Sequence, residues 1–229
     1  MTRLPLLAVF VLAVAAAAEA QGNEPRLQRG EVTVSGGATF AGGYPVGDTT
    51  ANLRRNTNLG TPPPFPFLRA ESDILRAFGF EARVGVAITP SIELEVGGGY
   101  VTPRLDVTIS QDDEVDERVS ITERLTQYTV DVSGVYLIPG AAITPRMRPY
   151  VIGGGGYLRQ LHEGRLDVET GTTFHVGGGV RYWLRGGRPK QQSLGVRGEV
   201  RLVRRTGGIE FEDEARTYPA ATMLAFVGF

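Results

Sequence analysis

Two histidines are the side chains of this sequence whose ordinary pKa lies closest to neutrality, and the chain contains no cysteine. A serine hydrolase needs a nucleophile beside a general base. Neither His162 nor His175 has a serine at the second following position, as a His-x-Ser pair would require. We expect His162 to be a solvated loop residue and His175 to be a polar filler, and we predict no catalytic residue. The absence of cysteine excludes disulfides and thiolate metal sites.

Carboxylates and arginines recur at alternate positions within otherwise apolar segments. Side chains two residues apart share one face of a strand, so these charges would point into a common interior if the strands enclose one. Such a set has two interpretations, a charged pore or gate and a plug of salt bridges. We favour the plug, because unpaired buried charges are costly. The residues are Glu81, Arg83, Glu93, Glu95, Asp131, Arg181, Arg197, Glu199 and Arg201, with Arg159 as a further candidate.

The segments that carry these charges alternate with a period of two residues, which indicates strands. The stretch 78–88 has Phe78 and Phe80 on one face and Glu81 and Arg83 on the other. A soluble sandwich would also produce this alternation. The pattern predicts eight strands, at residues 32–40, 78–88, 92–100, 128–138, 150–161, 174–184, 194–202 and 217–229, of which the fifth and eighth have ambiguous facing.

The connections between these segments alternate in length. Those after the second, fourth and sixth strands are short or moderate, and those after the odd-numbered strands are mostly long and polar. Outer-membrane barrels have short turns on one side and longer loops on the other. We therefore predict an eight-stranded antiparallel up-and-down transmembrane β-barrel with both termini on the periplasmic side. A ten-stranded barrel would need two strands from residues 42–72, which lack alternation and contain a Thr-Pro-Pro-Pro run at 61–64, so we predict an external loop there.

The N-terminal segment has the layout of an export signal. One positive residue, Arg3, precedes an apolar run at 4–18, and Ala-Glu-Ala at 18–20 supplies the small residues that a signal peptidase requires. The run is shorter than the roughly 20 residues that a membrane-spanning helix needs. We predict a signal peptide over residues 1–20 and one barrel domain over 21–229. With 24 Lys and Arg against 25 Asp and Glu, no basic excess suggests nucleic acid.

Glycine runs and acidic runs each suggest a ligand and each has a simpler interpretation. Glycines at 97–99, 153–156 and 177–179 would cradle a phosphate only at the start of a helix, and no helical periodicity follows them. They relieve crowding where a small barrel curves, so we predict no cofactor. The acidic runs lack the spacing of a Ca²⁺ loop, and we predict solvated loops and no metal site. They comprise Asp112, Asp113, Glu114, Asp116 and Glu117, then Glu210, Glu212, Asp213 and Glu214.

The export signal, the eight strands, the sequence Tyr-Val-Ile-Gly-Gly-Gly-Gly-Tyr at 150–157 and the C-terminal Phe229 together resemble the small outer-membrane barrels of the outer-membrane protein A transmembrane-domain type. The resemblance implies an outer-membrane location in contact with lipid. It also implies that the barrel-assembly machinery recognises Phe229 together with apolar residues at alternate positions before it. These positions are Ala221, Met223, Ala225 and Val227, which would turn Leu224 and Phe226 inward.

The resemblance is architectural and does not define an activity. We expect a non-enzymatic outer-membrane barrel with a structural or surface-interaction role. The alternative is a small passive, porin-like channel for ions or small solutes, and a lipid-modifying enzyme comes third. We expect outer-membrane lipid and the assembly machinery as partners and no nucleic acid, and the sequence specifies no small-molecule ligand.

Overall fold

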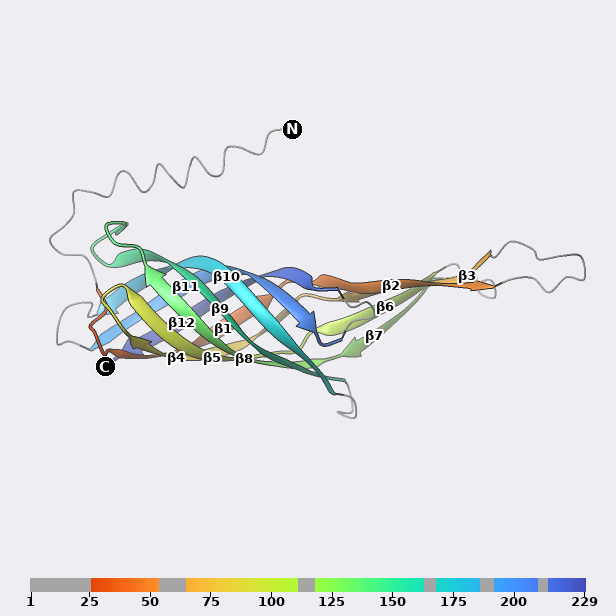
Figure 1. Ribbon diagram of the computed structural model, residues 1–229, viewed down its shortest axis with the longest axis horizontal. Helices are drawn as coiled ribbons and strands as arrows, with labels where there is room; N and C mark the ends of the chain where they lie inside the picture. Colours follow the sequence, from red (N-terminus) through yellow and green to blue (C-terminus); the bar gives the residue numbers. More distant parts are fainter. Residues whose placement is uncertain (1–25, 54–64, 111–117, 163–167, 186–191, 210–213) are drawn as a thin grey trace, which may run out of the picture.

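A computed structural model describes residues 26–53, 65–110, 118–162, 168–185, 192–209 and 214–229. The predicted signal peptide and nearly all of the two acidic runs lie outside these ranges. The described residues form an all-β structure (Figure 1). Its strands are β1 Val32–Ala41, β2 Tyr44–Leu53, β3 Phe65–Ile74, β4 Ala77–Ala87, β5 Ile92–Val101, β6 Arg104–Ser110, β7 Val119–Arg124, β8 Thr126–Leu137, β9 Met147–Leu161, β10 Val168–Arg185, β11 Ser193–Gly207 and β12 Arg216–Gly228.

Eight of these strands close into an antiparallel barrel in the order β1-β12-β11-β10-β9-β8-β5-β4. They correspond to the eight predicted segments, so the predicted fold class is confirmed. The first and last strands close the wall, with Thr33 paired to Gly228. We call the end of the barrel at Phe229 and the short connection 88–91 the turn end, and the opposite end the sheet end.

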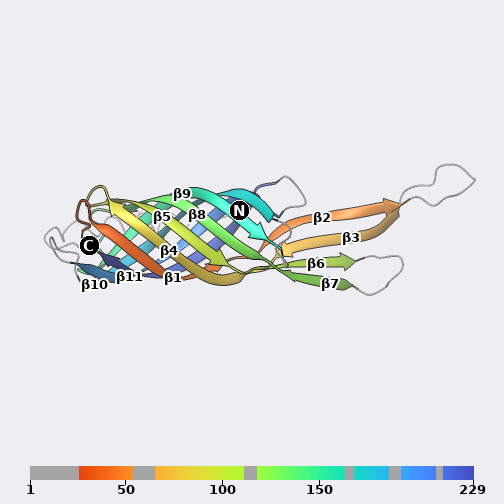
Figure 2. The same cartoon turned by 90° about the horizontal axis from the view of Figure 1, so that it is seen from below.

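The expectation that residues 42–72 contain no strand is wrong. They contain β2 and most of β3, which join β6 and β7 in a second sheet of order β2-β3-β6-β7. This extension sheet projects beyond the sheet end of the barrel (Figure 2). Alternation is weak there because much of β2 is exposed, so a strand pattern has no buried face to reveal it. The edge position of β2 also tolerates Pro45. None of these strands enters the barrel, so the ten-stranded alternative is wrong as well.

The barrel wall has an apolar outer surface and a polar inner one. Val84 of β4 and Val200 of β11, on the outer face, are 51% and 63% exposed. The strands with ambiguous facing are now assigned: Phe226 of β12 is buried inside, and Arg159 of β9 is exposed outside. The candidacy of Arg159 as an interior residue is therefore wrong. Four consecutive glycines precede it in the middle of β9, and they give the sequence no signal of facing. Within the described residues we find no helix whose length and apolar character would let it span a bilayer.

Glycines allow neighbouring strands to approach inside the wall. A Cβ atom on Gly156 would lie 2.1 Å from the carbonyl oxygen of Val130, and one on Gly177 would lie 2.2 Å from that of Val200. At either position, the Cβ of a larger residue would press against the main chain of the neighbouring strand. These contacts agree with glycine relieving crowding in a narrow, curved barrel.

Candidate functional site in the barrel interior

The barrel strands carry a dense group of ionised side chains into the interior. The nine charged residues selected from the sequence lie on β4, β5, β8, β10 and β11, and each is at most 7% exposed. The alternation of each strand places them there, because every second residue must face inward.

Six of the nine form a closed ring of ion pairs in which acids and arginines alternate. Going around the ring, each carboxylate lies within 4.0 Å of the guanidinium groups on both sides of it. Among these pairs, Arg83 lies 3.3 Å from Glu95, and Glu199 lies 3.5 Å from Arg197 and 3.2 Å from Arg201. We call this group the charge ring; its members are Glu81, Arg83, Glu95, Arg197, Glu199 and Arg201.

Further contacts attach the remaining three charges to the ring. Arg181 donates to Glu93 at 2.6 Å and lies 3.7 Å from Glu95, while Arg83 lies 3.5 Å from Asp131. Every one of the nine residues therefore has an oppositely charged neighbour. Low exposure and mutual pairing satisfy the condition under which a protein tolerates buried charge.

Apolar side chains fill the turn end of the interior. Trp183 and Phe226 pack edge to face, with ring centres 6.0 Å apart, and the guanidinium carbon of Arg181 lies 5.0 Å from the centre of the Phe226 ring. We call this group the turn-end layer; its members are Leu27, Ala87, Val135, Leu137, Tyr150, Ile152, Trp183 and Phe226. Tyr150 links the layer to the charge ring, because its hydroxyl donates to Glu199 at 2.5 Å.

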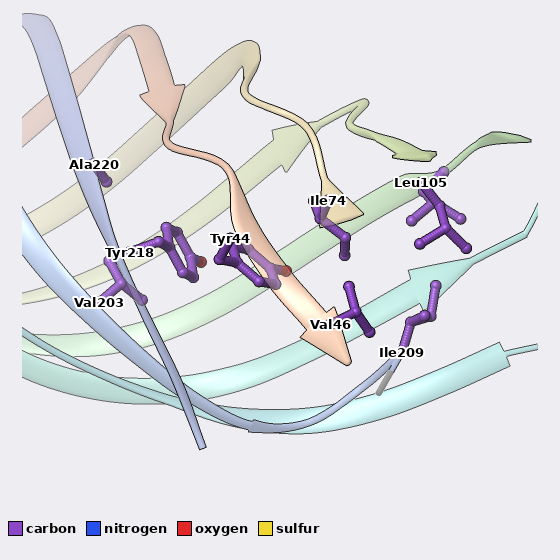
Figure 3. Packing of buried hydrophobic residues seen from close by; sticks show 9 residues of the cluster. Tyr44, Val46, Ile74, Leu105, Val203, Ile209, Tyr218 and Ala220 are labelled. Atoms are coloured by element: carbon purple, nitrogen blue, oxygen red, sulfur yellow. The ribbon is translucent and has the colours of Figure 1, made fainter. Parts of the chain in front are cut away.

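A second apolar group fills the sheet end (Figure 3). The rings of Tyr44 and Tyr218 stack with centres 4.7 Å apart. Burial raises the pKa of the Tyr44 hydroxyl, which accepts a hydrogen bond from Arg205 at 2.6 Å. Arg205 also donates to Gln160 at 3.1 Å. We call the group the sheet-end layer; it contains Tyr44, Val46, Ile74, Leu105, Leu125, Val203, Ile209, Tyr218 and Ala220.

Two interior residues, Arg205 and Tyr44, lie outside the strands that the sequence predicted. Arg205 continues the inward alternation of Arg197, Glu199 and Arg201, and it was overlooked because the predicted strand ends at residue 202 whereas β11 runs to Gly207. Extending the count of alternate positions would have found it. No such pattern pointed to Tyr44, because the segment around it lacks the alternation of apolar and polar residues that predicts a strand.

A cavity of about 60 Å³ remains between the charge ring and the sheet-end layer. Its lining includes Asp131, His175, Arg201 and Tyr218. A space of this size and polarity suits a few water molecules.

His175 lies in the wall of this cavity, beside Ser133 and Asp131. The sequence did not predict this contact, because His175 belongs to β10 and the other two residues belong to β8. The Ser133 hydroxyl donates to Asp131 Oδ1 at 2.7 Å, and its oxygen lies 3.0 Å from His175 Nε2. In a catalytic triad the histidine takes the serine proton and the carboxylate holds the histidine. Here the serine proton is directed to the carboxylate, so the arrangement is not that of an activated nucleophile.

His162 and Phe229 lie outside the charge ring. His162, expected in a solvated loop, is half-buried, and its Nδ1 lies 3.0 Å from Glu123 Oε1. Phe229 is 65% exposed and its main chain pairs with Val32. Its role as an assembly signal stays a prediction. Among the described residues no group of three or more His, Asp or Glu side chains is placed to hold a metal ion.

Comparison with known families identifies the class of protein that this fold defines. The model of the outer membrane protein β-barrel domain family matches residues 5–216. The chain therefore belongs to this family and is an outer-membrane protein. No curated protein sequence matches it.

The solved structures that this chain is similar to include three small outer-membrane β-barrel proteins. Neisserial surface protein A is 11% identical, with 86% of this chain and 94% of that chain covered and a TM-score of 0.46. OprG from Pseudomonas aeruginosa is 11% identical, with 90% and 96% covered and a TM-score of 0.46. Ail of Yersinia pestis is 14% identical, with 88% and 99% covered and a TM-score of 0.39. Identities and TM-scores this low carry no information about activity.

Proposed function

We propose that this protein is a non-enzymatic barrel that anchors a surface-interaction sheet in the outer membrane. The observation that carries the proposal is the extension sheet, which continues past the barrel with apolar side chains exposed on one face. We place the sheet on the outside of the cell, because short connections mark the periplasmic end of such barrels and the connection 88–91 lies at the turn end.

The extension sheet has two chemically different faces. Across β6 and β7, Val107 pairs with Ile121 and Ile109 with Val119. Val119 and Ile121 are 43% and 57% exposed, whereas Val107 and Ile109 are half-buried and Val107 packs against the sheet-end layer. On the opposite face Asp106 accepts hydrogen bonds from the hydroxyls of Ser120 and Thr122, each at 2.8 Å. Exposed apolar side chains of β7 beyond the barrel, with a polar face behind them, favour a surface that a partner covers.

The filled interior supports an anchor rather than a channel. The charge ring lies between the turn-end and sheet-end layers, and an eight-stranded barrel is only just wide enough for side chains. A passive channel for ions or small solutes, the alternative, would require these layers to move apart. Single-channel recording of the refolded protein in a planar bilayer tests the two readings. We expect silence, and steady conductance would favour the channel.

The surface role has its own test, with matched controls on one strand. The double variant Val119→Lys/Ile121→Lys places two charges on the apolar face of β7, and Ser120→Lys/Thr122→Lys places the same charges on its polar face. We measure adhesion of whole cells to hexadecane droplets, at equal outer-membrane levels of each protein. Loss of adhesion with the first variant alone supports the proposal. Equal adhesion by both variants and the wild type would contradict it.

A further inference from the structure

Three arginines stand where adjacent barrel strands leave the wall at the sheet end. Arg76 directly precedes β4, Arg104 begins β6 just beyond the end of β5, and Arg124 ends β7 just before β8. Strands β4, β5 and β8 are neighbours in the barrel, so the three residues lie side by side on its rim. We call them the rim arginines.

Unlike the interior arginines, the rim arginines have no acidic partner among the residues that the structure describes. All three are exposed, and no carboxylate in the described part of the chain forms an ion pair with any of them. Arg104 and Arg124 are even paired directly across β6 and β7. Like charges in this position repel each other, which an anion between them would relieve.

Two of the rim arginines line a groove of about 900 Å³. Leu75, Ala77 and Phe78 contribute its apolar lining, and Asp73 is the single carboxylate in it. Phe78 is 75% exposed and belongs to the outer wall of the barrel, where its ring centre lies 5.0 Å from that of Phe40. The groove therefore combines cationic groups with an apolar surface that continues down the wall.

Aromatic residues indicate the depth of the rim in the membrane. Tyr100 and Tyr128, on the outer wall of β5 and β8, lie with ring centres 5.3 Å apart, and Phe78 lies on neighbouring β4. Aromatic girdles of outer-membrane barrels sit at the membrane–water interface. The rim arginines follow directly beyond this girdle, at the level of lipid headgroups.

We propose that the rim arginines bind the phosphate monoester of a lipid headgroup in the adjacent leaflet, with one of its acyl chains lying along Phe78. A guanidinium group suits a phosphate because two parallel N–H donors match two of its oxygens. An amphiphile satisfies both halves of the groove, whereas free phosphate satisfies only the arginines. The leaflet is the outer one if the sheet end faces outward, as proposed above.

Lipid binding is tested by native mass spectrometry of protein released from phosphatidylcholine nanodiscs that contain either phosphatidic acid or diacylglycerol. We expect the wild type to retain phosphatidic acid, and Arg76→Gln/Arg104→Gln to bind it about tenfold more weakly, as expected for the loss of charged hydrogen bonds. The matched control is Arg204→Gln, which removes an exposed arginine from the outer wall of β11 and should leave binding unchanged. A heat-dependent shift in gel mobility verifies that each variant is folded.

Three results would overturn the assignment: equal retention of diacylglycerol, an equal loss with Arg204→Gln, or full displacement of the lipid by inorganic phosphate. The last result would mean that the groove takes the free ion. Both leaflets of the nanodisc have the same composition, so binding there does not depend on orientation. Surface proteolysis of intact cells tests orientation separately, since the extension sheet should be cut only if it faces outward.

Discussion

Arg197 reaches across the full width of the barrel to Glu95. Glu95 lies on β5 and Arg197 on β11, and these two strands stand opposite each other in the closed order of eight. Both terminal nitrogens of Arg197 donate to the carboxylate, with 2.9 Å between Nη2 and Oε2. Side chains therefore connect walls that no main-chain hydrogen bond joins.

Breaking this pair should destabilise the barrel strongly. We expect Arg197→Gln or Glu95→Gln alone to lower the free energy of unfolding by up to about 3–5 kcal/mol, because each removes a charge that balances the buried ion pairs, although Glu95 keeps Arg83 and Arg197 keeps Glu199 as neighbours. The double variant should lose less than the sum of the two. Urea unfolding in lipid bilayers measures all three, with the exposed Arg204→Gln as a control on the same strand. Additive losses would mean that the two residues do not interact, and a leak in the double variant would indicate that the ring also blocks conduction.

The outer wall should reject charge at mid-depth. Val84→Arg and Val200→Arg should each cost about 2–4 kcal/mol of folding free energy, because both side chains face hydrocarbon. Thr122→Arg, on the extension sheet, serves as the control and should change little. Folding titrations in vesicles compare the variants. Full tolerance of arginine at Val84 would place that position outside the bilayer.

Close approach of the strands makes Gly156 a sensitive position. Gly156→Ala should destabilise the barrel by about 1–3 kcal/mol, since its Cβ would overlap the main chain of β8. Gly198→Ala is the matched control, because a Cβ there would meet nothing within 4 Å. Both variants are compared by urea unfolding. Equal stability of the two would show that the wall yields at no measurable cost.

Removal of Phe229 should affect assembly more than stability. Its side chain is largely exposed and packs little, so the refolding midpoint of the truncated chain in detergent should hardly change. The outer-membrane yield in cells should fall, because the resemblance to known barrels assigns this residue to the recognition signal. A normal yield would make Phe229 an ordinary strand residue.

The sequence predicted the barrel strands because a lipid-facing side must be apolar while the inner side is free to be polar, so alternation is strong. It did not predict the extension sheet, since most of β2 is exposed and its side chains show little contrast between the two faces. The inward charges were found from alternation alone, but their partners were not, because alternation gives a facing and not a register between distant strands. Ser133 and His175 illustrate this point. They lie on β8 and β10, on either side of β9, so their contact depends on the register of both strands against β9.

The pairing of Val32 with Phe229 sets a condition on the timing of folding. The first and the last residues of the barrel complete each other's main-chain hydrogen bonds, so no shorter piece of the chain can close the wall. Contacts between residues so far apart in sequence form slowly. Until β12 is available to pair with it, β1 would present an unpaired edge that invites aggregation. We therefore expect the barrel to close only after the whole chain through β12 is available.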